Sequence, residues 1–135
     1  MKKTKDKIGF SLINIRTDQF AIFEENFDEK GRITLNTNLS YGLNKVEKNF
    51  TVSTKFTFEI RQKPFLSIEI SCFFNIMEAS FKEFINEDNT IIPKGFVAHM
   101  VMLTYGTARG VLHSKTESTI FNKFILPTTN VAEMI

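Results

Sequence analysis

Three stretches of the sequence alternate apolar and polar residues with a period of two, and this alternation constrains the fold more than any other feature. From residue 33 to residue 43 every odd position except Thr37 is apolar. The stretches 50–60 and 66–76 repeat the pattern with the apolar residues Phe50, Val52, Phe56, Phe58, Ile60, Leu66, Ile68, Ile70, Cys72, Phe74 and Ile76. Because successive side chains of a strand point to opposite faces, each stretch predicts a strand with one face in a core.

A further, less regular strand is predicted over residues 9–23. Its apolar residues change phase from Phe10 and Leu12 to Ile13 and Ile15, which indicates a bulge or bend. The connections at 28–31 and 44–48 are short, and short connections favour antiparallel neighbours because a parallel pair needs a long crossover. The sequence therefore predicts an antiparallel meander with one covered face and one polar face.

Helices are predicted after the strands. Residues 77–86 predict a short helix, and Pro93 suits the first turn of a long helix over 94–114. Asn130 is a suitable N-cap for a final helical turn over 131–135. The predicted class is α+β: a four-stranded antiparallel sheet with a long helix packed on one face and a short C-terminal helix. Residues 1–7 predict a basic flexible tail, and residues 8–135 a single domain.

The long helix carries more apolar surface than one sheet covers. One column of apolar residues is Phe96, Met100, Leu103 and Val111, and a second is Val97, Val101, Ala108 and Leu112. We expect the second column to meet another subunit. Gly106 and Gly110, four residues apart, would let a neighbouring backbone come close. The predicted oligomer interface therefore consists of Val97, Val101, Gly106, Ala108 and Gly110.

Composition excludes several classes of protein. The 17 basic and 15 acidic side chains are interspersed outside the first seven residues, which argues against a nucleic-acid-binding protein. The most apolar segment, 96–112, is interrupted by His99, Thr104, Thr107 and Arg109, so no membrane insertion is expected. The single cysteine, Cys72, cannot form an intramolecular disulfide, which fits a cytoplasmic protein.

The residues that could support catalysis are few. His99 and His113 lie 14 residues apart on the predicted helix, about 21 Å along its axis, and so cannot share a metal ion within one subunit. Cys72 lies on the apolar side of its strand, where a thiol behaves as a small hydrophobic group. No cleft is indicated that would pair two carboxylates as acid and base. We therefore expect no enzyme, no metal site and no cofactor.

Phenylalanine is unusually abundant, with 15 residues in a chain of 135. So many aromatic side chains either pack a dense core or remain available to an apolar partner. Three of them, Phe20, Phe23 and Phe27, flank the end of the first predicted strand. Two more, Phe121 and Phe124, lie in the loop before the predicted last helix.

The order of elements and three short motifs resemble the SecB family of export chaperones over residues 9–135. Phe23-Glu24 falls where the family has a Phe-Glu pair before its crossover loop, and Ile92-Pro93 where a hydrophobic-Pro pair opens the main helix. Leu126-Pro127-Thr128-Thr129-Asn130 resembles the family's Leu-x-Pro-x-Asn segment. The sequence departs from the family at Lys94-Gly95 and Val131, and it ends soon after Asn130 without the acidic tail that contacts the SecA motor.

The resemblance implies a SecB-like fold, a homodimer or homotetramer, and a holdase that binds unfolded or non-native polypeptides. Such a chaperone would act in protein export or for a dedicated client such as an antitoxin; delivery to SecA is not implied. In the family, the two regions that hold Phe20, Phe23, Phe27, Phe121 and Phe124 line the client groove, so these residues are the predicted client-binding set.

Two other functions remain open. The phenylalanines could instead line a closed cavity of an apolar small-ligand binding module. The chain could also be a structural subunit of a larger complex.

Overall fold

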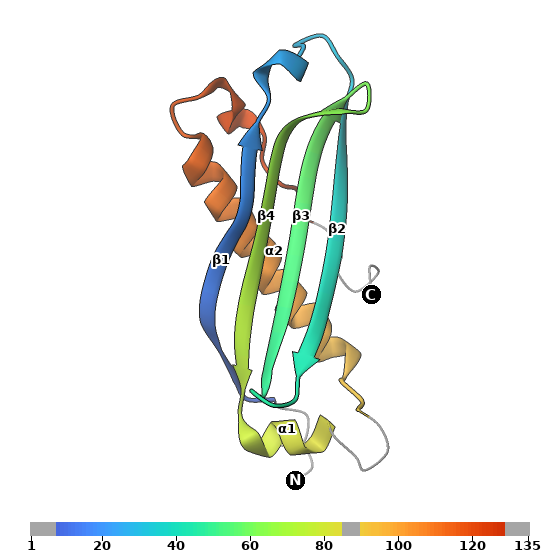
Figure 1. Ribbon diagram of the computed structural model, residues 1–135, viewed down its shortest axis with the longest axis vertical. Helices are drawn as coiled ribbons and strands as arrows, with labels where there is room; N and C mark the ends of the chain where they lie inside the picture. Colours follow the sequence, from blue (N-terminus) through green and yellow to red (C-terminus); the bar gives the residue numbers. More distant parts are fainter. Residues whose placement is uncertain (1–7, 85–89, 129–135) are drawn as a thin grey trace.

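The computed structural model describes residues 8–84 and 90–128 of the chain. Four strands form one antiparallel sheet, and a long helix runs diagonally across one of its faces (Figure 1). The elements in chain order are β1 (Phe10–Ile22), the 3-10 turn η2 (Glu24–Asn26), β2 (Ile33–Asn44), β3 (Asn49–Ile60), β4 (Lys63–Ile76), α1 (Glu78–Phe84), α2 (Lys94–Thr116) and the 3-10 turn η3 (Ile120–Lys123). The predicted α+β class is confirmed, with its four antiparallel strands and one long helix. The predicted tail 1–7 and final helix 131–135 lie outside the described residues, and the division into a tail and one domain stays a prediction.

The strand order is β1-β4-β3-β2, which corrects the predicted meander at one connection. β2, β3 and β4 do form a meander, but β1 pairs with β4 at the opposite edge from β2. Residues 23–32, here called the crossover connection, carry the chain across the end of the sheet (Figure 1). Ten residues span about 33 Å when extended, and three strand spacings need only about 14 Å, so a short connection did not require β1 and β2 to be adjacent.

The covered face of the sheet follows the predicted alternation. In β3 every second residue from Phe50 to Ile60 is buried, and the paired inward residues of β4 are buried beside them. β4 departs from the pattern at its start, where a register shift leaves both Phe65 and Leu66 buried. The phase slip predicted in β1 is also confirmed, because the β1–β4 register shifts between Leu12 and Asn14 and between Thr17 and Gln19.

The burial of α2 corrects the interpretation of its two apolar columns. Its buried residues form one broad face: Phe96, Val97, Met100, Val101, Thr104, Tyr105, Ala108, Leu112 and Thr116. The two columns contain residues adjacent in sequence, such as Phe96 and Val97 or Met100 and Val101. Pairs of this kind, repeated every three to four residues, lie on one side of a helix, so most residues of both columns face the same sheet. Leu103 is the exception and is 38% exposed. One sheet therefore does cover the main apolar face of the helix.

α2 packs against the two central strands, β3 and β4. The helix-side faces of the edge strands are consequently only partly covered. On β1, Leu12 and Ile15 are exposed, and on β2, Ile33 and Tyr41 are exposed while Leu35, Leu39 and Leu43 are half-buried. Two apolar rows thus remain open to solvent, one on each side of the helix.

Candidate functional site

Aromatic rings from distant segments meet at the end of the sheet where the crossover connection lies. This crossover cluster consists of Phe27, Phe58, Phe65, Phe121 and Phe124. The Phe27 ring lies 5.0 Å from that of Phe65 and 5.2 Å from that of Phe121, measured between centroids. Phe124 lies 5.2 Å from Phe65 and 5.6 Å from Phe58. The fold therefore brings together Phe27, Phe121 and Phe124, which the sequence placed in two separate client-binding regions.

The predicted client-binding residues differ in how much surface they offer. Phe23 is 38% exposed, and Phe20, Phe27 and Phe124 are half-buried. Phe121 is only 2% exposed, so its assignment to the surface needs correcting: its ring is part of the core of the protomer. A ring at the centre of a packed cluster has little area left for a partner. Four of the five predicted residues therefore present apolar surface.

Two phenylalanines that the prediction did not include complete the crossover cluster. Phe58 lies on the alternating face of β3, and its position in a core was predicted. Phe65 was not predicted, because the regular alternation of β4 begins only at Leu66. The signal that could have identified Phe65 is the break in alternation directly after Pro64, where two apolar residues follow each other.

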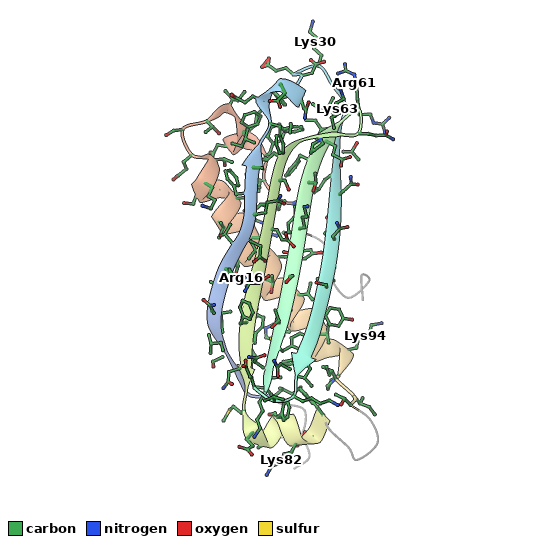
Figure 2. All side chains as sticks on the ribbon, in the orientation of Figure 1. Arg16, Lys30, Arg61, Lys63, Lys82 and Lys94 are labelled. Atoms are coloured by element: carbon green, nitrogen blue, oxygen red, sulfur yellow. The ribbon has the colours of Figure 1, made fainter. Side chains whose placement is uncertain are left out.

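Hydrogen bonds fix the crossover connection against the start of β4. The Phe23 N–H donates to the Phe65 carbonyl at 2.8 Å, and the Asn26 amide donates to the Pro64 carbonyl at 2.7 Å. Asp28 forms an ion pair of 3.0 Å with Arg61. Figure 2 labels Arg61 at this end of the sheet. The backbone N–H of Lys30 and then the Arg61 guanidinium lower the pKa of the Asp28 carboxyl below its ordinary value.

The segment after α2 is fixed by side chains of the helix and of its own first turn. The Thr119 hydroxyl accepts a hydrogen bond from the Phe121 N–H at 3.1 Å and so caps η3. The Arg109 Nε donates to the Leu126 carbonyl at 2.8 Å. These contacts hold Phe121 and Phe124 against the sheet although the segment contains only one short turn of helix.

Charges of both signs surround the half-exposed rings. The Lys123 Nζ lies 5.7 Å from the Phe27 ring and 5.5 Å from the Phe124 ring, and the Lys115 Nζ lies 5.7 Å from the Phe20 ring. Glu24 and Glu25 line a hollow of about 320 Å³ together with Ile22, Thr119 and Phe121. An apolar surface with a mixed polar rim can accept varied apolar side chains, because the hydrophobic effect is not directional.

The predicted oligomer interface is only partly at the surface. Val97, Val101 and Ala108 are buried in the core of their own protomer, so the prediction is wrong for these three residues. Gly106 and Gly110 are exposed and lie on the face of α2 that points away from the sheet. We call this face the α2 outer strip; it consists of the exposed residues Gly95, His99, Met102, Leu103, Gly106, Gly110 and His113.

The α2 outer strip is unusual for a solvent-facing helix surface. It contains no Lys, Arg, Asp or Glu, although its His113 lies 3.8 Å from the Glu117 carboxylate, and Met102 is 56% exposed. A Cβ atom added at Gly95, Gly106 or Gly110 would meet nothing within 4 Å. Packing within the protomer therefore does not require these glycines, although Gly106 and Gly110, inside the helix, each cost about 0.5–1 kcal/mol of helix stability relative to alanine.

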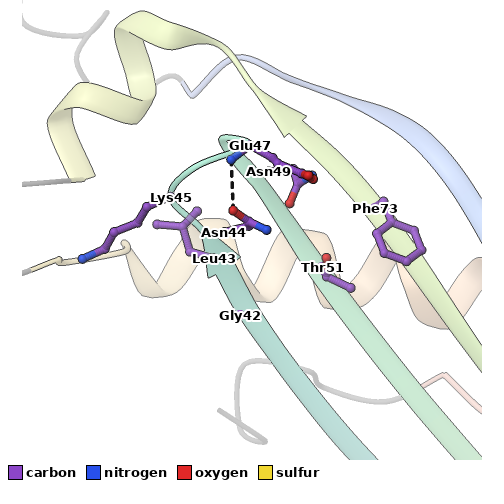
Figure 3. Close-up of a pocket in the computed structure, with 8 residues that line it drawn as sticks. All are labelled: Gly42, Leu43, Asn44, Lys45, Glu47, Asn49, Thr51 and Phe73. Carbon is purple, nitrogen blue, oxygen red and sulfur yellow. Dashed lines mark hydrogen bonds between the residues drawn. The ribbon is translucent and has the colours of Figure 1, made fainter.

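A second hollow, of about 640 Å³, lies on the polar face of the sheet beside the β2–β3 hairpin (Figure 3). Phe73 is the aromatic residue in its lining, and the Arg16 guanidinium lies 4.9 Å from that ring. Asn44 accepts hydrogen bonds from the N–H groups of Val46 and Glu47, both at 3.0 Å, and so closes the hairpin. These contacts explain the shape of the hairpin but indicate no ligand.

Two types of reactive site that the sequence raised can be checked among the described residues, a metal site and a cysteine nucleophile. Within residues 8–84 and 90–128, no three His, Cys, Asp or Glu side chains are grouped so that they could hold a metal ion. Burial raises the pKa of the Cys72 thiol, which disfavours the thiolate that a nucleophile requires. Of the described helices, none has the length and apolar character needed to cross a membrane.

Comparison with solved structures identifies the architecture. A Mycobacterium tuberculosis SecB-like chaperone, solved in complex with a ChAD peptide from the HigA1 antitoxin, superposes with a TM-score of 0.56 over 89% of this chain and 90% of its own. The fold is SecB-like. At 13% sequence identity, this similarity concerns the fold. A Streptococcus agalactiae protein of unknown function matches at 14% identity over 90% of this chain and 99% of its own, but its TM-score of 0.33 supports no argument. No protein-family model matches the SecB-like chain, and neither does any curated protein.

Proposed function

We propose that this SecB-like protein is a non-enzymatic chaperone, a holdase that binds unfolded or non-native polypeptides in the cytoplasm. The observation that carries the proposal is the apolar surface left open beside a well-packed core. This surface combines the half-exposed rings Phe20, Phe23, Phe27 and Phe124 with the partly covered apolar rows of β1 and β2. Unfolded chains expose apolar side chains in no fixed order, and such a surface binds them without requiring one sequence.

The peptide in the Mycobacterium complex supports a polypeptide as the partner of this fold. We propose protein export or service to a dedicated client, such as an antitoxin, as the setting. The small-ligand alternative has less support, because the phenylalanines of the crossover cluster lie ring against ring at 5.0–6.4 Å and fill the space between them.

We also propose that the protein is a homodimer or homotetramer that pairs through the α2 outer strip. An uncharged helix surface with exposed Met102 and Leu103 is typical of a contact between subunits. Gly106 and Gly110 lie at its centre, where the absence of side chains allows a second helix to approach closely.

The holdase proposal is tested by light scattering of a denatured client protein diluted into buffer with and without the chain. Near-stoichiometric amounts are expected to suppress aggregation. Phe23→Ser is expected to weaken client binding about fivefold, because it removes an exposed apolar ring, while changing stability little.

Val46→Ser is the matched control, since Val46 is an exposed apolar residue in the β2–β3 hairpin at the opposite end of the sheet (Figure 1). Its activity should equal that of the unsubstituted protein. Aggregation that proceeds unchanged at a molar excess of the chain would refute the holdase function.

A further inference from the structure

β2 is an edge strand that lacks the usual protection of an edge. It pairs with β3 residue for residue from Ile33–Ile60 to Asn44–Asn49, without a bulge. Within residues 8–84 and 90–128, no strand lies on its other side. Natural edge strands usually avoid further pairing by means of charges, prolines or bulges. The twelve residues of β2 contain no charged residue and no proline.

The other edge of the sheet provides an internal comparison. β1 carries Arg16 and Asp18 within the strand, and its register with β4 shifts twice. A bulge twists a strand and interrupts its ladder of main-chain groups, which hinders the addition of another strand. In the part of the chain that the structure describes, the sheet therefore protects one edge and leaves the other as an unbulged, uncharged row of N–H and C=O groups about 40 Å long.

The two faces of β2 differ in a way that would select the sequence of an added strand. Its helix-side residues are mainly apolar and incompletely buried: Ile33, Leu35, Leu39, Tyr41 and Leu43. Its opposite face carries the short polar residues Thr34, Asn36, Asn38 and Ser40. A strand laid beside β2 would place alternate side chains next to an apolar row and next to uncharged polar groups.

Free positive charges flank the edge at both ends. Arg32 directly precedes β2 and Lys45 directly follows it, and both side chains are exposed. Among the described residues neither forms an ion pair. The nearby Glu47 carboxylate accepts a hydrogen bond from the Asn49 amide at 3.4 Å. The ends of the edge therefore favour an added strand with acidic flanks.

The same charges argue against a second copy of β2 as the occupant. Suppose that two copies of β2 pair antiparallel over their full length, with both apolar rows on the same face of the sheet. Arg32 of one copy then lies one position along the strand from the residue opposite Lys45 of the other copy. This happens at both ends of the pair. Each end of such a pair would bring two positive charges close together, and the β2 strand of the other copy offers no acidic side chain to offset them.

We propose that β2 takes up an extended segment of a bound polypeptide as a fifth strand of the sheet. The segment is uncharged in its middle, alternately apolar and polar, and flanked by acidic residues. Main-chain hydrogen bonds supply binding that is independent of sequence, and the apolar row and the two cations select the segment. This inference rests on the proposed function, and it adds the site, the conformation and the chemistry of the client.

The test uses a fluorescent synthetic peptide of alternating Val and Thr with Glu at both ends, about twelve residues long to match β2. In a β-pair, every second N–H of the peptide points to its neighbour. N-methylation of one alternate set of residues is expected to weaken binding at least tenfold, whereas methylation of the other set leaves affinity within about twofold. Replacing the terminal Glu residues by Lys is expected to weaken binding and to reduce its dependence on salt.

A matched pair of variants locates the site on the protein. Asn38→Lys places a charge at the centre of β2 and is expected to weaken peptide binding about tenfold. Asn14→Lys introduces the same charge at an exposed position of β1 and should leave binding unchanged.

The outcomes separate this inference from the proposed function. If the protein suppresses client aggregation but binds both methylated peptides equally, or binds no peptide, the edge proposal is overturned and the holdase function stands. If it suppresses no aggregation, the holdase function itself is refuted. Equal effects of Asn38→Lys and Asn14→Lys would also overturn the assignment to β2.

Discussion

At the scale of single residues, Asp18 shows how the β1 bulge organises the polar face of the sheet. Its carboxylate accepts a hydrogen bond from the Ser71 hydroxyl and forms an ion pair with Arg16, and Ser71 is in turn hydrogen-bonded to Ser53 at 2.6 Å. Burial acts to raise the pKa of Asp18, but the hydrogen bonds from Ser71 and Arg16 and the Arg16 charge outweigh it, and the pKa is lowered.

This lowered pKa makes the contribution of Asp18 to stability depend on pH. Ionised Asp18 stabilises the fold above its ordinary pKa of 3.8, and this contribution is lost as the pH falls through the lower native value. Asp18→Asn is therefore expected to reduce the free energy of unfolding by about 1 kcal/mol at pH 7. The difference from the unsubstituted protein should shrink at pH 3 and below, as measured by urea denaturation. Glu83→Gln, an exposed carboxylate without a described ion pair, should show neither effect; a pH-independent difference for Asp18→Asn would contradict the explanation.

Phe121 and Phe23 allow a buried phenylalanine to be compared with an exposed one. Because its ring is buried among Phe27, Phe65 and Phe124, Phe121→Ala is expected to lower the free energy of unfolding by about 3–4 kcal/mol. Thermal or chemical denaturation measures this loss. Phe23→Ala, at an exposed position, should cost less than about 1 kcal/mol in the same experiment. Similar losses for the two variants would show that Phe121 is not part of the core.

At the scale of elements, packing within the protomer does not explain the composition of the α2 outer strip, which combines glycines with exposed apolar side chains. Gly106→Lys is expected to shift the protein from an oligomer to a monomer in native mass measurement or light scattering, because a lysine would occupy the contact between helices. The fold should persist, since a Cβ at Gly106 meets nothing within 4 Å.

Gly42→Lys is the matched control for this prediction. Gly42 lies on β2 and its added Cβ likewise meets nothing within 4 Å, but the residue is remote from the α2 outer strip. The control should keep the mass of the unsubstituted protein. A protein that is monomeric before any substitution would contradict the proposed pairing through α2.

The sequence patterns predicted the helices and strands better than they predicted the order of the strands in the sheet. All four strands, the bulged character of β1 and the long helix were predicted, because each follows from the spacing of apolar residues along one segment. The spacing of residues did not predict the position of β1 in the sheet, and only the resemblance to a family with a crossover loop after its first strand pointed to it. Pairing between β1 and β4 is decided by which apolar face completes the core.

At the scale of the whole molecule, the proposed surfaces lie on different sides. The α2 outer strip faces away from the sheet, the edge of β2 runs along one side, and the crossover cluster lies at one end (Figure 1). A second copy packed on α2 would therefore leave the edge of β2 and the half-exposed phenylalanines accessible. Assembly and polypeptide binding are compatible in this arrangement.

The sequence by itself determined the strands, the long helix and the abundance of phenylalanine, because side-chain periodicity and composition are local properties. It could not tell which phenylalanines are core and which are surface: Phe23 and Phe121 have the same chemistry, and only the packing of the crossover connection against η3 buries one and exposes the other. For the same reason, the sequence predicted Val97, Val101 and Ala108 at a subunit interface, whereas the structure buries them in the core of the protomer. The diagonal course of α2 across the sheet decides this (Figure 1). Burial depends on contacts between segments far apart in the chain, and those contacts exist only in the folded structure.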